Sequence, residues 1–259
     1  MPFPRQKKTI VKENYLCLNT DNMTVTHIKN FMVESAIPSF CYGCKKPKTY
    51  LCEDCFEILK YMPHPICPHC KAALGMGKLR EDCRRELNLN RIFSCADYTD
   101  VKIKSLIKDL KYNYSFSLAR PLAEFAHWWL SKHEYADEIK NNVDLIIPVP
   151  VHKSKLKERG FNHTEKLAKH LGQLLDIPVV ELLIKTRKTI PQAKTKNKDE
   201  RSKNLKNVFS VTSIGQIKGK RVLIVDDVVT TGSTLRECAK VLRKNGAEEI
   251  WGLTIAQEL

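Results

Sequence analysis

The sequence Val222-Leu223-Ile224-Val225-Asp226-Asp227-Val228-Val229-Thr230-Thr231-Gly232-Ser233-Thr234 decides the fold class of this chain. Its first four residues are apolar, which is typical of a buried parallel strand, and two carboxylates follow where that strand should end. A Thr/Gly/Ser loop then leads into a predicted helix whose apolar face is Leu235, Cys238, Ala239 and Leu242. This order of strand, loop and helix predicts an α/β protein.

The loop is a predicted phosphate site. The first turn of a helix has backbone N–H groups without an intrahelical acceptor, and it carries the positive end of the helix dipole. Carboxylates would repel a phosphate, so we expect Asp226 and Asp227 to accept hydrogen bonds from neutral hydroxyls or to hold a bridging cation. A ribose 5-phosphate offers both kinds of group. The predicted phosphate contacts are Thr230, Thr231, Gly232, Ser233 and Thr234.

These thirteen residues resemble the phosphoribosyl-pyrophosphate (PRPP) motif of type I phosphoribosyltransferases. The resemblance implies the type I phosphoribosyltransferase fold, a Rossmann-like parallel sheet flanked by helices. It also implies that Asp226 and Asp227 are the catalytic carboxylates that hold the ribose 2- and 3-hydroxyls, that residues 230–234 cradle the 5-phosphate, and that Mg2+ binds together with PRPP.

Length and charge set further bounds. The 259 residues suffice for one α/β domain and a small module. The net charge is +15, and most of the excess lies in residues 101–259, which carry 29 basic and 18 acidic groups, so ligands with phosphates are favoured, nucleic acid included. No apolar run approaches the roughly 18 residues of a membrane span, and no signal core follows the basic start. We therefore expect a cytoplasmic protein without membrane insertion.

Cysteines predict a metal module. The chain has ten cysteines and no secretion signal, which favours metal thiolates over disulfides. Two Cys-x-x-Cys pairs are separated by seven residues, a spacing that allows one four-cysteine zinc site. The surrounding sequence is poor in apolar residues, so we expect this zinc to be structural. The four predicted ligands are Cys41, Cys44, Cys52 and Cys55.

A second cysteine unit is incomplete. Cys67, Cys70 and Cys83 follow the same pattern, but Glu86 stands where a fourth cysteine would be. In one reading these three bind a second zinc, with Glu86, His64, His69 or Cys95 as the fourth ligand. In another the unit has lost its metal. In a third a single site takes its pairs crosswise, with Cys67 and Cys70 replacing one of the first two pairs.

A second loop is expected to reach the same ligand. A short strand is predicted at residues 143–147, and the basic loop 152–162 follows it, on the ligand side of an open α/β sheet. By resemblance to type I phosphoribosyltransferases, the predicted pyrophosphate contacts are Val151, His152 and Lys153, together with Arg159 of the sequence Arg159-Gly160-Phe161-Asn162. The helix that follows has the predicted core positions Leu167, Ala168, Leu171, Leu174 and Leu175.

Residues 185–206 carry nine basic and two acidic groups and are too long for an ordinary connector, which predicts an active-site lid or else a disordered linker. Its expected contacts with pyrophosphate or a nucleic-acid backbone are Arg187, Gln192, Arg201 and Asn204.

The remaining elements follow from apolar patterns. Further strands are predicted at residues 177–180, 208–211 and 250–255. A basic amphipathic helix is predicted with Ile103, Leu106, Ile107 and Leu110 on its apolar face. The predicted plan is a poorly ordered arm (1–38), a zinc-ribbon module (39–92) and a phosphoribosyltransferase domain (93–259).

The chain resembles the ComF family over about residues 40–257. The resemblance rests on the order of its motifs, which are the cysteine units, the basic helix, Pro148-Val149-Pro150, residues 159–162 and residues 222–234. The resemblance implies binding of PRPP or a related phosphoribosyl ligand, a role in DNA uptake during natural transformation, and contact with single-stranded DNA and with a DNA-uptake helicase or other competence proteins. Two alternatives are open. One is a transferase that moves phosphoribose from PRPP to a nucleobase or another acceptor and releases pyrophosphate; the other is a non-catalytic regulator that senses PRPP.

Overall fold

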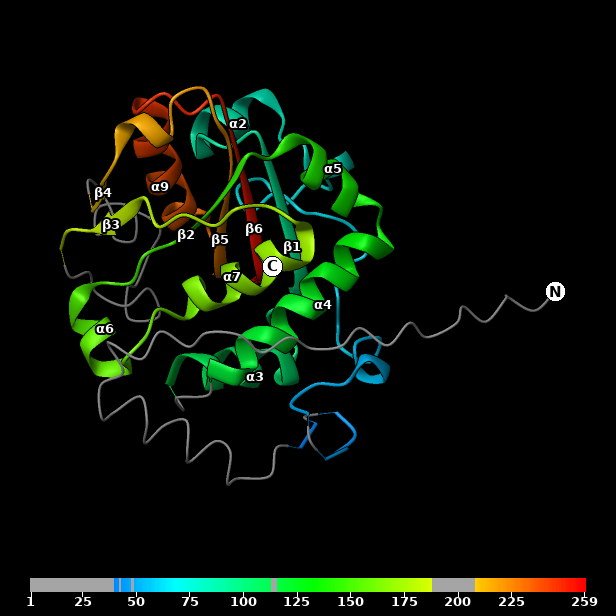
Figure 1. The fold of residues 1–259 in the computed structure, drawn as a ribbon. Coiled ribbons are helices and arrows are strands. Elements are labelled where there is room, and N and C mark those ends of the chain that lie inside the picture. The colour runs from blue at the N-terminus through cyan, green and yellow to red at the C-terminus, as the bar shows by residue number, and fades with distance from the viewer. Residues whose placement is uncertain (1–39, 42, 48, 113–115, 188–207) are drawn as a thin grey trace.

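A parallel four-stranded sheet forms the centre of the molecule (Figure 1). The computed structural model describes residues 40–41, 43–47, 49–112, 116–187 and 208–259, so the predicted arm lies outside the described residues. All neighbouring strands pair in parallel, and helices therefore make the crossovers. The strand order is β1 (Arg91–Asp97), β6 (Glu249–Gln257), β5 (Arg221–Val229) and β2 (Leu145–Pro148).

Helices cover both faces of this sheet (Figure 1). One face packs against α3 (Val101–Tyr112), α4 (Ala119–Lys132), α5 (Tyr135–Asn142) and α7 (His163–Leu175). The other face packs against α2 (Glu81–Leu87), α9 (Ser233–Lys244) and an antiparallel ribbon of β3 (Leu183–Lys185) and β4 (Phe209–Val211). Short 3-10 turns lie at Glu53–Cys55, Gly75–Gly77, Phe116–Leu118 and Ile214–Gln216. None of the described helices is long and apolar enough to cross a membrane.

The strand β5 is buried on both sides. Leu223 and Val225 belong to the core beneath α4 and α7, whereas Val222 and Ile224 belong to the core beneath α9. This alternation arises because successive side chains of a strand point to opposite faces. The predicted strand at the start of the opening motif is therefore confirmed, and it continues to Val229.

Other predictions needed correction. The predicted basic loop 152–162 contains a helix, α6 (Lys153–Arg159), because the His152 side chain accepts the Ser154 N–H at its start and Gly160, at φ 79°, ends it. The strand predicted at residues 177–180 is only a single bridge, between Val179 and Ile146.

One predicted core position is also wrong. Leu174 of α7 is 40% exposed, because it lies beside the buried stripe of the helix that includes Leu171 and Leu175. In contrast, the apolar face predicted for the basic helix is confirmed, since Ile103 and Leu110 at its two ends are fully buried in α3.

The cysteine-rich segment packs onto the sheet domain. Cys41 and Cys55 share a buried cluster with Phe125 and Trp129 of α4. The indole N–H of Trp129 donates to the carbonyl of Met62 at 2.6 Å. The strand β1 begins at residue 91, just before the predicted start of the phosphoribosyltransferase domain at residue 93. The two parts of the chain thus have a common core.

Candidate functional site

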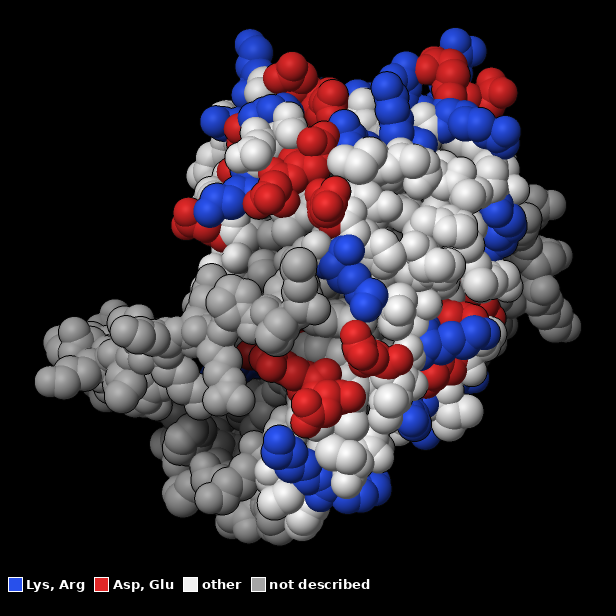
Figure 2. Space-filling view, turned by 90° about the vertical axis from the view of Figure 1, so that its right-hand side faces the viewer, with Lys and Arg blue, Asp and Glu red and all other residues white. Residues whose placement is uncertain are grey.

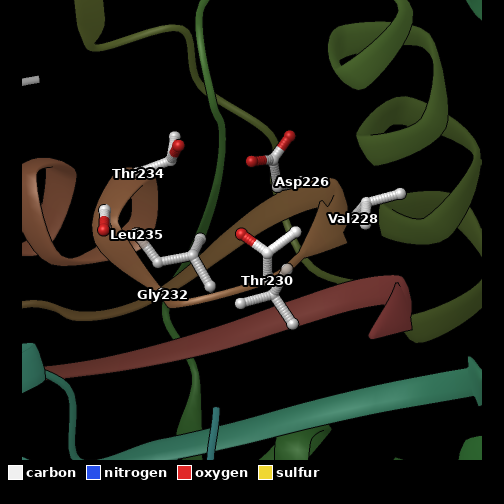
Figure 3. Close-up of a pocket in the computed structure, with 8 residues that line it drawn as sticks. Asp226, Val228, Thr230, Gly232, Thr234 and Leu235 are labelled. Carbon is white, nitrogen blue, oxygen red and sulfur yellow. The ribbon is translucent and has the colours of Figure 1, made fainter. Parts of the chain in front are cut away.

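The loop between β5 and α9 forms a small pocket at the carboxyl edge of the sheet (Figure 3). In Figure 3 the Asp226 carboxylate and the hydroxyls of Thr230 and Thr234 border the same space. Gly232 immediately precedes α9, so the N–H groups of the first helical turn belong to this loop. These N–H groups favour an anion at the loop. Its lining is Asp226, Val228, Val229, Thr230, Gly232, Ser233, Thr234 and Leu235.

Thr231 is the one predicted phosphate contact that does not line the pocket, although its hydroxyl lies 2.7 Å from that of Ser233. Gly232 determines the shape of the loop. Its φ of 78° is in the left-handed region that favours glycine, and an added Cβ would lie 2.7 Å from Leu87 Cδ2 and 3.4 Å from Pro68 Cγ. Pro68 belongs to the second cysteine unit, so this unit directly supports residues 230–234, the predicted phosphate loop.

The two adjacent aspartates point to opposite faces of β5. Asp226 borders the pocket, with Lys185 and Cys238 among its electrostatic neighbours. Burial, and then the charge of Asp227, raises the pKa of Asp226 to about 7. This carboxyl group therefore exchanges a proton near neutral pH.

Asp227 has a different environment, in which it is 4% exposed. Its Oδ2 accepts hydrogen bonds from Lys111 Nζ at 2.7 Å and from His163 Nε2 at 2.9 Å. Burial acts to raise the pKa of Asp227, but Lys111 and His163 together outweigh it and hold the pKa below its usual range. Burial lowers the pKa of His163 despite the neighbouring carboxylate. Asp227 is thus a fixed anion held by α3 and α7.

Arg159 extends this group of charges. It is 9% exposed, its guanidinium lies 4.8 Å from the centre of the Tyr112 ring, and its Nη1 lies 3.2 Å from His163 Nδ1. Gly160 and Asn162 fix the geometry, because Gly160 ends α6 and the Asn162 side chain caps α7. The structure therefore joins the predicted contact Arg159 to the cluster around Asp227.

The other predicted contacts have different surroundings. Val151 and His152 are half-buried, and Lys153 is exposed in the first turn of α6. Arg187 is exposed after β3, whereas Gln192, Arg201 and Asn204 lie outside the described residues. His163 was not among the predicted site residues; it begins α7 whereas Arg159 ends α6, so no helical spacing links the two in the sequence.

The first four cysteines converge. The Sγ atoms of Cys41, Cys44, Cys52 and Cys55 all lie within 4.8 Å of one another. The separations of Cys41 and Cys44 from Cys52 are 3.7 and 3.6 Å. A zinc tetrahedron with Zn–S bonds of about 2.3 Å has edges of about 3.8 Å. The group can therefore hold a metal such as zinc.

Cys67, Cys70 and Cys83 form a separate group, which excludes the crosswise arrangement. Arg80 Nη2 donates to Cys70 Sγ at 3.3 Å. None of the four predicted candidates for a fourth ligand joins this group among the described residues. Glu86 instead pairs with Arg236 of α9 at 2.9 Å, which ties the second cysteine unit to the phosphate loop again.

Comparison with known proteins identifies the family. The family described as Phosphoribosyl transferase domain matches residues 122–256, which include Asp226, Asp227 and the phosphate loop. Competence protein F of Haemophilus influenzae is 33% identical over 214 residues, covering 81% of this chain and 92% of the relative. The chain belongs to the ComF family. This ComF-family protein is also 29% identical over 228 residues to DNA utilization protein YhgH of Escherichia coli K12, covering 84% of this chain and 97% of the relative.

Competence protein ComFC of Bacillus subtilis is 26% identical over 208 residues, covering 78% of the ComF-family chain and 81% of the relative. The predicted fold class is confirmed, since the ComF-family chain combines a phosphoribosyltransferase domain around a parallel sheet with a cysteine cluster before it.

Proposed function

We propose that this protein binds PRPP or a related phosphoribosyl ligand together with Mg2+, and that it acts in DNA uptake in the cytoplasm, in contact with single-stranded DNA. The pocket of the β5–α9 loop carries the ligand assignment, because it combines a helix start and hydroxyl groups with one carboxylate. Two of the relatives are named for competence and one for DNA utilization, which supports the proposed role in DNA uptake.

The two carboxylates have separate tasks in this proposal. Asp226 borders the pocket, so it accepts hydrogen bonds from the ribose hydroxyls, and its oxygens suit Mg2+, which prefers carboxylate and phosphate ligands. Bound Mg2+ neutralises the charge of pyrophosphate. On the opposite face of β5, Asp227 fixes Lys111 and His163, and His163 in turn contacts Arg159. We assign the basic groups of this cluster to the pyrophosphate.

The same cations favour a transferase as the second candidate. Departure of pyrophosphate from PRPP builds negative charge, which Lys111 and Arg159 would stabilise from fixed positions. Release of pyrophosphate in the presence of PRPP and a nucleobase would distinguish this activity from binding alone.

The ligand assignment is tested by calorimetric titration of the protein with PRPP and Mg2+. We expect Asp226→Asn to weaken binding by at least about tenfold, because the variant loses the charge that accepts the ribose hydroxyls while keeping the shape of the side chain. Asp137→Asn removes an exposed charge of α5 and is the matched control. Equal affinity of Asp226→Asn and the wild type would contradict the ribose assignment.

A further inference from the structure

A hollow lined only by arginine and asparagine lies where α2 and α9 end. It is open to solvent, with an empty volume of about 820 Å3. The phosphate loop is at the opposite end of α9, and the twelve residues of this helix span roughly 18 Å at 1.5 Å per residue. The hollow is therefore separate from the candidate PRPP site. Its lining residues are Arg84, Arg85, Asn88, Asn90 and Arg243.

The charge of this hollow is strongly positive. Arg84 and Arg85 both pair with the carboxylate of Glu81, and Arg85 Nε lies 3.0 Å from Glu81 Oε1. Arg243 Nη2 donates to the Asn88 carbonyl at 3.3 Å and to Asn90 Oδ1 at 2.8 Å, which fixes its guanidinium. Each of these contacts uses one nitrogen of a guanidinium that has five N–H groups in all. Within the described residues, three cations thus border the hollow and keep donors for a ligand.

The chemistry of the lining favours a chain of phosphates. A guanidinium binds phosphate through two parallel N–H bonds, and an asparagine amide can both donate to and accept from a base edge. The lining has no aromatic ring to stack on a base, so a single nucleotide would gain little from it. Several separate guanidinium groups instead match phosphates that are spaced along a strand.

One other face of the molecule looks different. On the face shown in Figure 2, Lys and Arg are interspersed with Asp and Glu around a broad uncharged area, so the described residues of that face offer no continuous path for a polyanion. We propose that the arginine hollow binds the phosphodiester backbone of single-stranded DNA. This inference rests on the proposed function and names a DNA contact for it outside the PRPP site.

The test is fluorescence anisotropy with a labelled oligothymidylate at several salt concentrations. The variant Arg84→Gln/Arg85→Gln should bind at least about fivefold more weakly at low salt, and its salt slope should fall by about 1.4, or 0.7 for each lost phosphate contact. Both side chains are exposed, with 45 and 76% of their surface accessible, so the fold should be retained. Arg243→Gln provides a second, independent variant.

The matched control is Arg120→Gln/Lys169→Gln, which also removes two exposed cations that each pair with a glutamate. The control should bind DNA as the wild type does. Equal DNA binding by Arg84→Gln/Arg85→Gln and the control would overturn the inference. It would also be overturned if the double variant bound a polyglutamate peptide more weakly than the wild type but bound DNA equally well. A wild type that binds no DNA would overturn both the inference and the DNA part of the proposed function. Calorimetry with PRPP should give the same affinity for this variant and the wild type, so failure of the ligand proposal is detected separately.

Discussion

At the scale of single residues, the aspartate pair shows how two adjacent carboxyl groups can have opposite environments. Asp226 and Asp227 are adjacent, yet the pleat of β5 directs one to the pocket of the β5–α9 loop and the other to the cluster with Lys111 and His163. The pKa of Asp226 is raised to about 7, whereas that of Asp227 is held below its usual range. One carboxyl group can thus respond to pH near neutrality, while its neighbour remains charged and fixed.

The raised pKa of Asp226 predicts a pH-dependent stability. Between pH 3.8, the ordinary aspartate pKa, and about pH 7, the raised pKa of Asp226, this carboxyl group holds more protons in the folded protein than in the unfolded chain. The contribution of Asp226 to the free energy of unfolding therefore falls as the pH rises through this window. Asp226→Asn removes that loss. At pH 8 we expect the thermal midpoint of this variant to exceed that of the wild type by about a few degrees. The difference should shrink as the pH approaches 4.

Calorimetric unfolding scans from pH 4 to pH 8 measure this difference. Asp137→Asn, the exposed control, should follow the wild type throughout. A midpoint difference that is the same at pH 4 and pH 8 would show that Asp226 does not titrate in this range.

At the scale of secondary structure, α2 and the second cysteine unit support the start of α9. Leu87 and Pro68 lie against the bare Cα of Gly232, and Glu86 pairs with Arg236 one turn into the helix. The loop at residues 230–234 is therefore held in place by contacts with α2 and the second cysteine unit. This arrangement gives a packing reason for glycine at residue 232 in addition to its left-handed backbone.

Gly232→Ala tests that support. A left-handed alanine costs about 1 to 2 kcal/mol, and here the new methyl group would also collide with Leu87. Gly219→Ala is the matched control, since Gly219 has a similar φ of 71° and no atom within 4 Å of an added Cβ. In urea titrations we expect Gly232→Ala to lose about 1 to 3 kcal/mol more than Gly219→Ala, and calorimetry should show weaker PRPP binding for Gly232→Ala alone. Equal losses would mean that Leu87 yields without cost.

Much of the element plan could be predicted from the sequence because it depends on local patterns. The helical spacing of Ile103, Leu106, Ile107 and Leu110 matches their burial, and the opening motif contains its own strand, loop and helix start. The helix α6 was missed because its charged residues show no apolar stripe. His163 was missed because its partner Asp227 is 64 residues away, a distance that no local pattern spans. The three-cysteine group was left open for the same reason, since only packing shows that Glu86 pairs with α9.

At the scale of the whole molecule, the first cysteine group and the sheet domain form one core. Cys41 and Cys55 are buried together with Phe56 and Trp129, so the first cysteine group lies at the edge of the main cluster rather than on a separate lobe. Metal binding to cysteine thiolates is coupled to folding, because the unfolded chain has no preformed site. Removal of a zinc ion held by this group should therefore weaken the entire fold.

Cys44→Ser tests this coupling, because Cys44 is exposed and serine replaces the thiolate with little change in volume. We expect the purified variant to contain one equivalent of zinc fewer by mass spectrometry, and its thermal midpoint to fall by several degrees, roughly, in a single calorimetric transition. Lys46→Ser, an exposed change in the same turn, should alter neither quantity. Two separate transitions in the variant, with the upper one unchanged, would show that the cysteine-rich segment unfolds on its own as an independent module. A single lowered transition would mean that zinc stabilises the sheet that carries Asp226 and the phosphate loop.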